Sequence, residues 1–425
     1  MLATPELIRE AAQRSRLAEL LPRWRELPLY REPLAQAGCE RSDFNCFQKL
    51  PLLGKQAMRE NFPHNFLPAG RSLDVLVEQK LVELEHTSGT SEERLPVILG
   101  RGWWNEQEEH ALRLNDFVAR VLQEHPAARR ATLVPPACNG LTCPTVWSSR
   151  EQRTMGNTLF LNLARIPFLL DESELSRMAA EVAGWSPQFL DMDPVHGAWF
   201  ALHCEKRGIR FPSLRFVLAS YEFVSVVHRR ILERVFGVPV FNLYGSTETG
   251  HLLMENERGE MKSGYDTAFL EIVEPDEAGI GDLVVTTLTN DYMPLLRYRI
   301  GDLAQRHTQP YGSRFVVHGR ARDALRATEG RRVTTWEVDQ CFTETNGIAH
   351  YELRQDRPGD GLLRFVPDGA GPSGPALCRL TRQLEVLLGS RREIKTELLP
   401  TLVPAASGKF RLTRPATAAN PPAGV

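Results

Sequence analysis

The sequence lacks the marks of several special classes of protein. No apolar run approaches the roughly 20 residues that a membrane-spanning helix needs. The first residues lead into a charged, helix-like segment without an apolar signal core. There is also no internal repeat. We therefore expect a cytoplasmic globular protein with no membrane partner.

The cysteines form no recognisable framework. Seven are present, an odd number without the spacing of a disulfide-rich fold. Cys39 and Cys46 are close in sequence, as are Cys138 and Cys143, but neither pair has the two-residue spacing of a zinc site. We therefore expect reduced thiols, the usual state in a cytoplasm.

Charge of one sign is not in excess either. The chain has 51 basic and 53 acidic residues, which gives a net charge of −2. This balance gives no bulk attraction to nucleic acid, so we expect no nucleic-acid partner. A hydrophobic content of 42% and a charged content of 24% are typical of a globular protein, and 425 residues predict two or three domains.

The hydrophobic pattern predicts an α/β fold. Apolar residues at helical spacing predict an amphipathic helix over residues 6–30, and alternation predicts a strand at 82–86. Strand-like and helix-like runs then alternate, which favours a mostly parallel sheet. The strands expected there are residues 131–134, 168–170, 187–190 and 214–219, followed by a helix over 226–236.

The hydrophobic pattern changes in the last third of the chain. From about residue 267, short β-like runs predict a β-rich lobe, with strands at 269–273, 282–288 and 315–317. The polar residues 319–323 form a boundary, so we predict an N-terminal domain over 1–318 and a small α+β domain over 324–425. In the latter we expect strands at 351–353, 362–366 and 397–403 and a helix over 377–388.

The strongest chemical pattern lies between residues 241 and 250. The apolar, β-branched residues 238–241 predict a short buried strand, and the character changes after Tyr244 to glycine, hydroxyls and a carboxylate. In an open α/β sheet, ligands bind at the carboxyl ends of the strands. The stretch therefore predicts a ligand site, with an ordinary strand and polar turn as the alternative.

The residues after Tyr244 suit a nucleotide. Gly245 allows the backbone to approach a ligand closely. Ser246 and Thr247 can donate to phosphate oxygens. Glu248 can bind Mg²⁺, which prefers oxygen ligands and often bridges a carboxylate and a phosphate.

Three other short segments fit the same ligand. Thr87-Ser88-Gly89-Thr90 follows a predicted strand and has a composition that cradles phosphate. Gly301-Asp302 places a carboxylate after a glycine turn, which suits a ribose diol. Gly408-Lys409 provides a flexible ammonium near the end of the chain. Taken singly, each segment is also compatible with an ordinary loop or turn.

In order and spacing, these segments resemble the adenylate-forming ligases, which include acyl-CoA synthetases, peptide-synthetase adenylation domains and luciferases. The resemblance covers nearly the whole chain. Within this superfamily the sequence is most similar to the phenylacetate–CoA ligase branch. The segments that carry this likeness are Leu50-Pro51 through Lys55, Asn61-Phe62-Pro63, Thr286 through Thr289, Pro294 through Arg299, and Gly408-Lys409.

The resemblance implies a two-step reaction that uses ATP and Mg²⁺. A carboxylate attacks the α-phosphorus of ATP to give an acyl-adenylate and pyrophosphate, and a second nucleophile, typically a thiol, then displaces AMP. The resemblance implies that Thr87, Ser88, Gly89 and Thr90 contact the β- and γ-phosphates and that Thr247 contacts the α-phosphate. It implies that Glu248 binds Mg²⁺, that Asp302 contacts the ribose with Arg320 close by, and that Tyr244 contacts the adenine. Lys409 would bridge the carboxylate and the α-phosphate. Residues 319–323 would be a hinge, and the small domain would move about it.

Two departures from the family pattern affect this interpretation. Glu92 and Glu93 follow the phosphate loop where the family usually has a glycine and a basic residue, so the loop is expected to be less effective. The region 254–262 has neither the cysteine nor the histidine that resemble metal ligands in much of the branch. We therefore predict no structural zinc.

The resemblance also places the acyl pocket. Asn139 and Gly140, His196, and Tyr221 with Glu222 fall where the branch builds its substrate cavity. For each of them, ordinary packing or surface exposure is the alternative. Aromatic residues near these segments favour an aryl or arylacetyl acid. Asp191 and Asp193 would leave room for a substrate amino group.

The sequence leaves three functions open. The first is an ATP-dependent ligase that joins a carboxylic acid to CoA or to the phosphopantetheine of an acyl carrier protein. The second is adenylation followed by amide formation with an amine. The third is a nucleotide-binding member with impaired turnover, which Glu92 and Glu93 favour slightly. The oligomeric state is also open, with a homodimer as one option.

Overall fold

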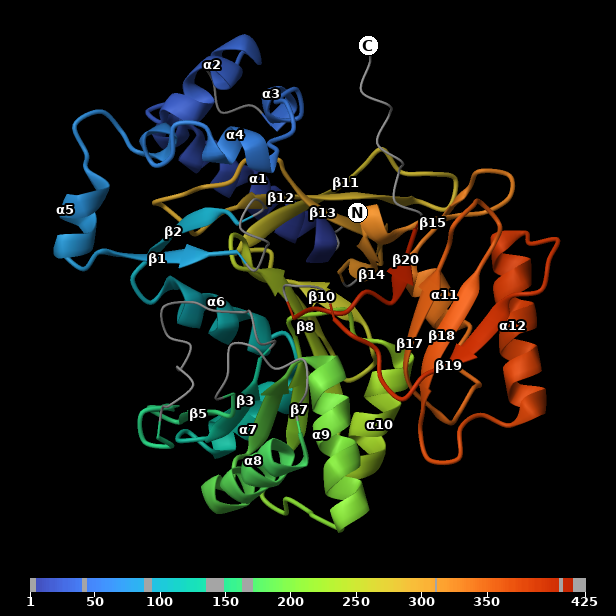
Figure 1. Cartoon of the computed structure of the whole chain (residues 1–425). Helices are drawn as coiled ribbons and strands as arrows, with labels where there is room; N and C mark the ends of the chain where they lie inside the picture. Colours follow the sequence, from blue (N-terminus) through green and yellow to red (C-terminus); the bar gives the residue numbers. More distant parts are fainter. Residues whose placement is uncertain are drawn as a thin grey trace, which may run out of the picture. The chain divides into compact units, whose positions relative to one another are not determined.

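The computed structural model describes residues 5–39, 44–87, 94–134, 149–162, 171–309, 312–404 and 408–415 (Figure 1). The described residues fall into two compact units. Unit 1 contains the residues up to Ala128 and Phe241–Val316, and unit 2 contains those from Arg129 to Val240 and from Val317 onward. Because the chain crosses between the units more than once, neither unit is a continuous segment.

Unit 1 begins with helices. They are α1 (Pro5–Trp24), α2 (Pro28–Gln36), α3 (Phe44–Phe47), α4 (Lys55–Arg59), the 3₁₀ helix η1 (His64–Phe66) and α5 (Leu73–Glu78). The helix predicted over 6–30 is confirmed, but it is divided between α1 and α2, with Pro28 at the first position of α2. Leu17, Leu20 and Leu21 are buried, as their spacing predicts.

Cys39 and Cys46 form a disulfide, so the expectation of reduced thiols is wrong for this pair. Of the other cysteines in the described part of the chain, Cys204 is buried and free. Cys138 and Cys143 lie outside the described residues. Among the described residues, no helix combines the length and apolar character that crossing a membrane requires.

The rest of unit 1 is mainly β-structure. An antiparallel ribbon of β1 (Val82–His86) and β2 (Pro96–Gly100) precedes α6 (Trp103–Leu112) and α7 (Asp116–Glu124). The strands then follow the order β11-β12-β13-β14-β10-β9-β8 across a sheet. Their bounds are β8 Val240–Ser246, β9 Gly250–Glu255, β10 Met261–Ser263, β11 Ala268–Val273, β12 Ile280–Thr287, β13 Tyr298–His307 and β14 Arg314–Arg320. Two of these strands cross the division between the units, because β8 begins with the last residue of unit 2 before Phe241 and β14 passes into unit 2 at Val317.

Unit 2 contains the parallel strands that the α/β pattern predicts. β3 (Arg130–Leu133) pairs in parallel with β5 (Thr158–Phe160) and β6 (Phe189–Met192), and β6 pairs in parallel with β7 (Phe216–Ala219). The short β4 (Thr154–Met155) runs antiparallel to β5. The helices are α8 (Glu172–Trp185), α9 (Pro194–Arg207) and α10 (Val226–Phe236). The strand predicted at 168–170 lies outside the described residues.

The end of the chain forms a second sheet in unit 2. Its strand order is β19-β18-β17-β20, with β17 (Ile348–Arg354) antiparallel to β18 (Leu362–Pro367) and parallel to β20 (Thr413–Arg414). β19 covers Lys395–Leu398, so the strand predicted over 397–403 begins and ends earlier than expected. The other elements are η2 (Ala321–Asp323), β15 (Leu325–Arg326), β16 (Arg332–Val333), α11 (Thr335–Gln340) and α12 (Gly374–Leu388).

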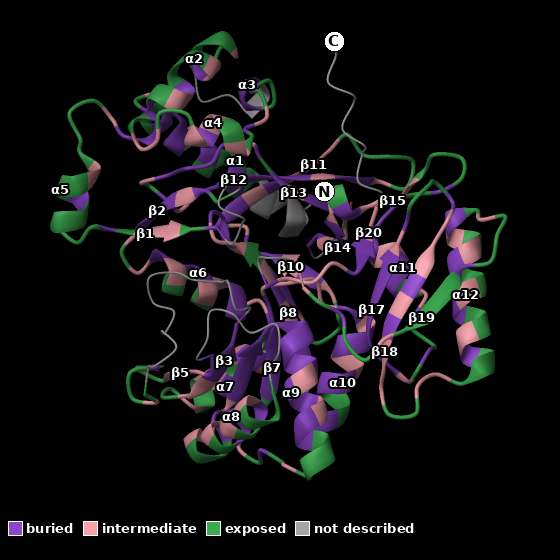
Figure 2. Ribbon diagram, in the orientation of Figure 1, coloured by how far each residue is buried: buried purple, intermediate pink, exposed green. Residues whose placement is uncertain are grey.

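One hydrophobic core serves both parts of unit 2. It includes residues of β3, β6 and β7 and residues of β17 and α12. Figure 2 shows β3 and β7 almost wholly buried, as expected for parallel strands that are covered on both faces. The predicted boundary at residues 319–323 falls on the end of β14 and on η2, and its role as a hinge stays a prediction.

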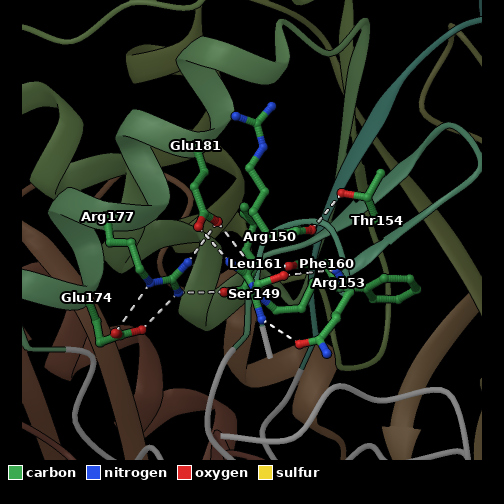
Figure 3. A network of polar contacts seen from close by, with 10 residues as sticks. Ser149, Arg150, Arg153, Thr154, Phe160, Leu161, Glu174, Arg177 and Glu181 are labelled. Carbon is green, nitrogen blue, oxygen red and sulfur yellow. Dashed lines mark hydrogen bonds and ion pairs between the residues drawn. The ribbon is translucent and has the colours of Figure 1, made fainter. Parts of the chain in front are cut away.

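A buried ion network joins the β4–β5 hairpin to α8 (Figure 3). Glu181 accepts from Arg153 and from Arg177, and Arg177 also donates to Glu174. The two arginines also donate to the backbone carbonyls of Phe160 and Leu161. Because the Arg153 side chain is only 2% exposed, its charge depends on Glu181 for compensation.

Candidate functional site

The polar stretch in unit 1 forms the tip of a hairpin. β8 pairs antiparallel with β9, with Gly245 opposite His251 and Ser246 opposite Gly250. The predicted strand is therefore confirmed, but it continues through Ser246 and turns back instead of ending after Tyr244. In the turn, the hydroxyls of Ser246 and Thr249 lie 2.9 Å apart. The turn thus gathers small polar groups at one end of the sheet.

Gly245 is required by the close packing of this hairpin. A Cβ atom at this position would lie 2.2 Å from the carbonyl oxygen of Gly250. Backbone cannot move away from such a contact without breaking the pairing of β8 and β9. The close approach predicted for Gly245 is thus made to the neighbouring strand.

Gly245→Ala is expected to lower the free energy of unfolding by about 1–3 kcal/mol, the usual cost of overpacking. Urea unfolding would measure the loss. Gly54→Ala is the matched control in the same unit, because Gly54 has φ of −106° and no atom within 4 Å of its Cβ position. Equal stability of the two variants would contradict the hairpin packing described here.

Glu248 lies in the turn but is buried, with an exposed fraction of 3%. Its Oε1 accepts a hydrogen bond of 2.8 Å from the hydroxyl of Tyr298, the first residue of β13. Mg²⁺ commonly takes one or two protein carboxylates together with phosphate oxygens, so this single carboxylate beside hydroxyls fits the ion.

Asp302 lies inside β13 and not after a turn, although Gly301 before it has φ of +92°. The carboxylate is 5% exposed and accepts a hydrogen bond of 2.7 Å from the hydroxyl of Tyr244. Tyr244–Asp302 and Tyr298–Glu248 are therefore two tyrosine–carboxylate pairs between the hairpin and β13. Together they bring two of the predicted nucleotide-binding carboxylates to one part of unit 1.

The predicted phosphate loop is described only at its first residue. Thr87 is buried and extends the pairing of β1 with β2, since its hydroxyl accepts from the backbone N–H of Leu95 at 2.9 Å. Ser88, Gly89 and Thr90 lie outside the described residues, as do Glu92 and Glu93. Arg320 ends β14 and belongs to unit 2.

Unit 2 brings Lys409 together with two predicted acyl-pocket residues. The Lys409 Nζ donates to the backbone carbonyl of Tyr221 at 3.0 Å. The next residue, Phe410, donates its backbone N–H to both carboxylate oxygens of Glu222, at 3.1 and 3.2 Å. These contacts join positions 188 residues apart in sequence. Asn139 and Gly140 lie outside the described residues.

The surroundings of Glu222 are unusual for a carboxylate. Burial raises the pKa of Glu222 well above its ordinary value, and the negative charge of Asp193 raises it further. The ammonium of Lys409 and the N–H of Phe410 act in the opposite direction and lower the pKa. Glu222 is thus held to the residue after Lys409 by the Phe410 N–H, and the nearby lysine charge opposes the rise of its pKa.

His196 is a buried residue at the start of α9, only 1% exposed, so a surface position is excluded. Its Nδ1 lies 2.8 Å from Oδ1 of Asp193, and that oxygen also caps α9. Asp191 accepts from the hydroxyls of Ser220 and Tyr221. The oxygens of Asp191 are therefore engaged within the fold, which removes support for Asp191 as the contact of a substrate amino group.

The structure adds residues that the sequence did not single out. The ring of Phe410 contacts those of His196, Trp199 and His350 at centroid distances of 5.7, 5.3 and 4.7 Å. His350 in turn shares a contact of 2.9 Å with His228, whose pKa is lowered by burial to about 4. Phe410 could have been noticed as the neighbour of Lys409, but no sequence signal marks the two buried histidines.

Asp339 joins the terminal sheet to α10. Its carboxylate accepts from the hydroxyls of Ser225 and Tyr351 and from the backbone N–H of Val226. Burial raises the pKa of Asp339 to about 6, although these donors oppose the shift. The folded protein therefore binds this proton more tightly than the unfolded chain does.

Asp339→Asn is expected to remove part of the pH dependence of stability. A raised pKa stabilises the fold fully below the ordinary value near 3.8, and this contribution is lost as the pH rises through about 6. The unfolding free energy of the parent should thus fall between these pH values by up to about 3 kcal/mol relative to the variant. Urea unfolding at several pH values measures this difference. Asp368→Asn, which removes a carboxylate paired with Arg234, should show the same pH dependence of stability as the parent. If Asp339→Asn also shows the pH dependence of the parent, the raised pKa of Asp339 is contradicted.

Within the described part of the chain, no three His, Cys, Asp or Glu side chains come together as a metal-binding group. The expected lack of a structural zinc stays a prediction. The roles given to the site residues also stay predictions, because the geometry shows their neighbours and not their ligands.

Comparison with known proteins shows which proteins the chain resembles. No family model matches the chain. Over 353 residues the chain is 23% identical to a phenylacetate–coenzyme A ligase of Pseudomonas putida, covering 79% of this chain and 75% of the relative. Over 431 residues it is 24% identical to a phenylacetate–coenzyme A ligase of Escherichia coli, covering 94% and 93%. These relatives are CoA ligases, in line with the resemblance of the sequence motifs to the adenylate-forming ligases.

The similarity to phenylacetate–CoA ligases agrees with the branch that the sequence motifs predict. A crystal structure of 2-hydroxyisobutyryl-CoA ligase in the postadenylation state has a similar fold, with a TM-score of 0.69 and 17% identity over 95% of this chain and 88% of that chain. The α/β fold class of an adenylate-forming ligase is confirmed.

Proposed function

We propose that this chain is an adenylate-forming ligase that activates a carboxylic acid with ATP and transfers the acyl group to the thiol of CoA. The observation that carries the proposal is the pair of tyrosine–carboxylate contacts, Tyr244–Asp302 and Tyr298–Glu248. They hold a carboxylate suited to a ribose diol and one suited to Mg²⁺ against the same hairpin. Such an arrangement matches the needs of a bound nucleoside triphosphate.

The residues of the hairpin would bind and orient ATP. Asp302 would accept hydrogen bonds from the ribose hydroxyls, and Tyr244 would lie beside the adenine. Thr247 would contact the α-phosphate and Glu248 would hold Mg²⁺. The ion, when bound, supplies positive charge that offsets the repulsion between the triphosphate and the incoming carboxylate.

Lys409 would act on the reacting groups. Its ammonium would bridge the attacking carboxylate and the α-phosphate and stabilise the negative charge that develops there. The bond that forms joins a carboxylate oxygen to the α-phosphorus, and pyrophosphate leaves. In the second step the thiol sulfur attacks the acyl carbon, and AMP leaves.

An aromatic acid is the substrate class that the surroundings of Lys409 favour. His196, Trp199 and Phe410 place three rings together beside this lysine in unit 2. Because flat rings stack well on aromatic side chains, such lining suits an aryl or arylacetyl acid.

A panel of acids tests the proposal. Pyrophosphate release would be measured with ATP, Mg²⁺ and aryl, arylacetyl and short aliphatic acids, each with CoA, a phosphopantetheinylated carrier protein or an amine. We expect release that requires an acid and is fastest with an aromatic acid and CoA. Faster product formation with a carrier protein or an amine would redirect the second step to that acceptor. No release with any acid would favour a member with impaired turnover.

Asp302→Ala is expected to raise the KM for ATP by about tenfold or more, since a hydrogen bond to a charged group is lost in the ground and transition states alike. Tyr244→Phe is the matched control, because it removes the contact between these two residues and leaves the carboxylate. If Asp302 only holds Tyr244, the two variants will have the same KM, and the ribose contact will be wrong.

A further inference from the structure

An aspartate and a histidine form a buried pair at the start of α9. The Oδ1 atom of Asp193 accepts from the backbone N–H groups of Val195 and His196, at 3.0 and 2.9 Å. The Nδ1 atom of His196 lies 2.8 Å from the same oxygen. Because a carboxylate only accepts hydrogen bonds, the proton of the neutral imidazole is on Nδ1 and points to Asp193. Asp193 thus fixes both the orientation and the tautomer of the ring.

The second nitrogen of the same ring has no hydrogen-bond partner. Within the described part of the chain, no group bonds to Nε2 of His196, although this atom is buried. Buried polar atoms are nearly always hydrogen-bonded, so an exception calls for a role beyond stability. In the tautomer that Asp193 fixes, Nε2 carries the free lone pair of the ring and can take up a proton. A histidine that an aspartate orients in this way has the arrangement of a general base.

The ring of His196 lies against the segment that carries Lys409. Its centroid is 5.7 Å from that of Phe410, the residue after Lys409, and 5.5 Å from that of Trp199. If the small domain moves Lys409 away after adenylation, as predicted, Phe410 leaves together with it. One side of the His196 ring is then uncovered. His196 would therefore become available in the second half-reaction, next to the place that the lysine has left.

The second half-reaction needs a base. The nucleophile is the thiolate, and a thiol with a pKa of about 8.5 is only slightly ionised at neutral pH. We propose that His196, oriented by Asp193, is the general base that takes the proton of the acceptor thiol. The proton passes from sulfur to Nε2, sulfur bonds to the acyl carbon, the bond from this carbon to the phosphate oxygen breaks, and AMP leaves as an anion. This role rests on the proposed function, because it presumes an acyl-adenylate and a thiol acceptor.

The first experiment compares the two half-reactions in His196→Gln. Thioester formation from synthetic phenylacetyl-adenylate and CoA should slow by about 10²-fold or more, the usual contribution of a general base. Exchange of pyrophosphate into ATP involves no thiol, so it should fall much less. His203→Gln is the matched control, because His203 is a buried histidine of the same helix that pairs with Glu172 instead. It should form thioester as the parent does, and an undiminished rate in His196→Gln would overturn the proposal.

Thiols of different acidity distinguish proton transfer from a structural role. N-acetylcysteamine and the more acidic 2,2,2-trifluoroethanethiol would replace CoA as acceptors. Since an acidic thiol ionises without help, the defect of His196→Gln should be large with the first thiol and small with the second. Asp193→Asn keeps a residue that can cap α9 but removes the charge that orients the ring, so it should show the same pattern with a smaller defect. It provides the answer if His196→Gln does not fold, and equal defects with both thiols would overturn the proton transfer.

The parent protein separates this proposal from the proposed function. If the parent forms thioester and His196→Gln does so equally fast, the general base is wrong and the ligase function stands. If the parent forms no thioester from any acyl-adenylate of the acid panel, the thiol acceptor of the proposed function is wrong, and the role of His196 falls with it. Pyrophosphate exchange by the same parent preparation then shows whether the first half-reaction still stands.

Discussion

Lys409→Ala is expected to slow acyl-adenylate formation by a factor on the order of 10²–10³, the loss that follows removal of one preorganised donor at a developing anion. Carboxylate and α-phosphate repel each other, and the lysine ammonium is the side-chain charge placed beside the predicted acyl pocket in unit 2. Acid-dependent pyrophosphate release by the purified variant measures this loss. Lys395→Ala, on the exposed strand β19, is the matched control and should behave as the parent.

The second half-reaction gives this prediction its specificity. Started from synthetic acyl-adenylate and CoA, Lys409→Ala should form thioester at nearly the rate of the parent, because the predicted small domain moves Lys409 away after adenylation. Equal damage to both halves would mean that Lys409 supports the fold or the acceptor site. If Lys409→Ala forms acyl-adenylate at the rate of the parent, the match of Gly408-Lys409 to the family pattern is accidental.

Glu181→Ala is expected to lower the free energy of unfolding by about 3–5 kcal/mol. Glu181 is the carboxylate shared by Arg153 and Arg177, and the Arg153 side chain is almost fully buried (Figure 3). Its removal leaves a buried guanidinium without its carboxylate. The loss would be measured by urea unfolding.

Glu174→Ala is the natural control for this variant. Glu174 pairs with Arg177 at 2.9 Å, but its side chain is 33% exposed, and half-exposed pairs contribute about 0–1 kcal/mol. Similar losses for both variants would show that burial of Arg153 does not set the energy of the network.

The sequence predicted best the elements whose signals are local. The helix α10 has the bounds that its spacing predicts, with Ser225 capping its start and Gly237 ending it in a left-handed conformation. Apolar period and end signals lie within a few residues of each other in such elements, so no distant contact is needed to place them.

The errors concern properties that depend on how segments of the chain pair and pack. Nothing local shows that β8 continues to Ser246, because its pairing with β9 decides this. Burial of His196 follows from packing with Phe410, more than 200 residues away. The disulfide between Cys39 and Cys46 joins residues seven positions apart, and its formation depends on how the backbone folds between α2 and α3.

For the candidate site, the sequence likewise predicted what local motifs show and missed the contacts that folding creates. Motifs located Glu248, Asp302 and Lys409, since a family keeps chemistry-bearing residues in recognisable local order. Their partners could not be read from the sequence. Tyr298 lies 50 positions from Glu248, and nothing in the sequence distinguishes it from the other tyrosines as the partner of this carboxylate. Which carboxylates are compensated, and by what, is a property of the folded chain.

The most direct test of the account is the exchange of labelled pyrophosphate into ATP without any acceptor. Reversal of acyl-adenylate formation returns the label to ATP, so exchange reports the first half-reaction alone. We predict exchange that requires both a carboxylic acid and Mg²⁺, is fastest with an aromatic acid, and is lost in Lys409→Ala. Exchange that proceeds without any acid, or ATP cleavage that yields only ADP and phosphate, would contradict the account.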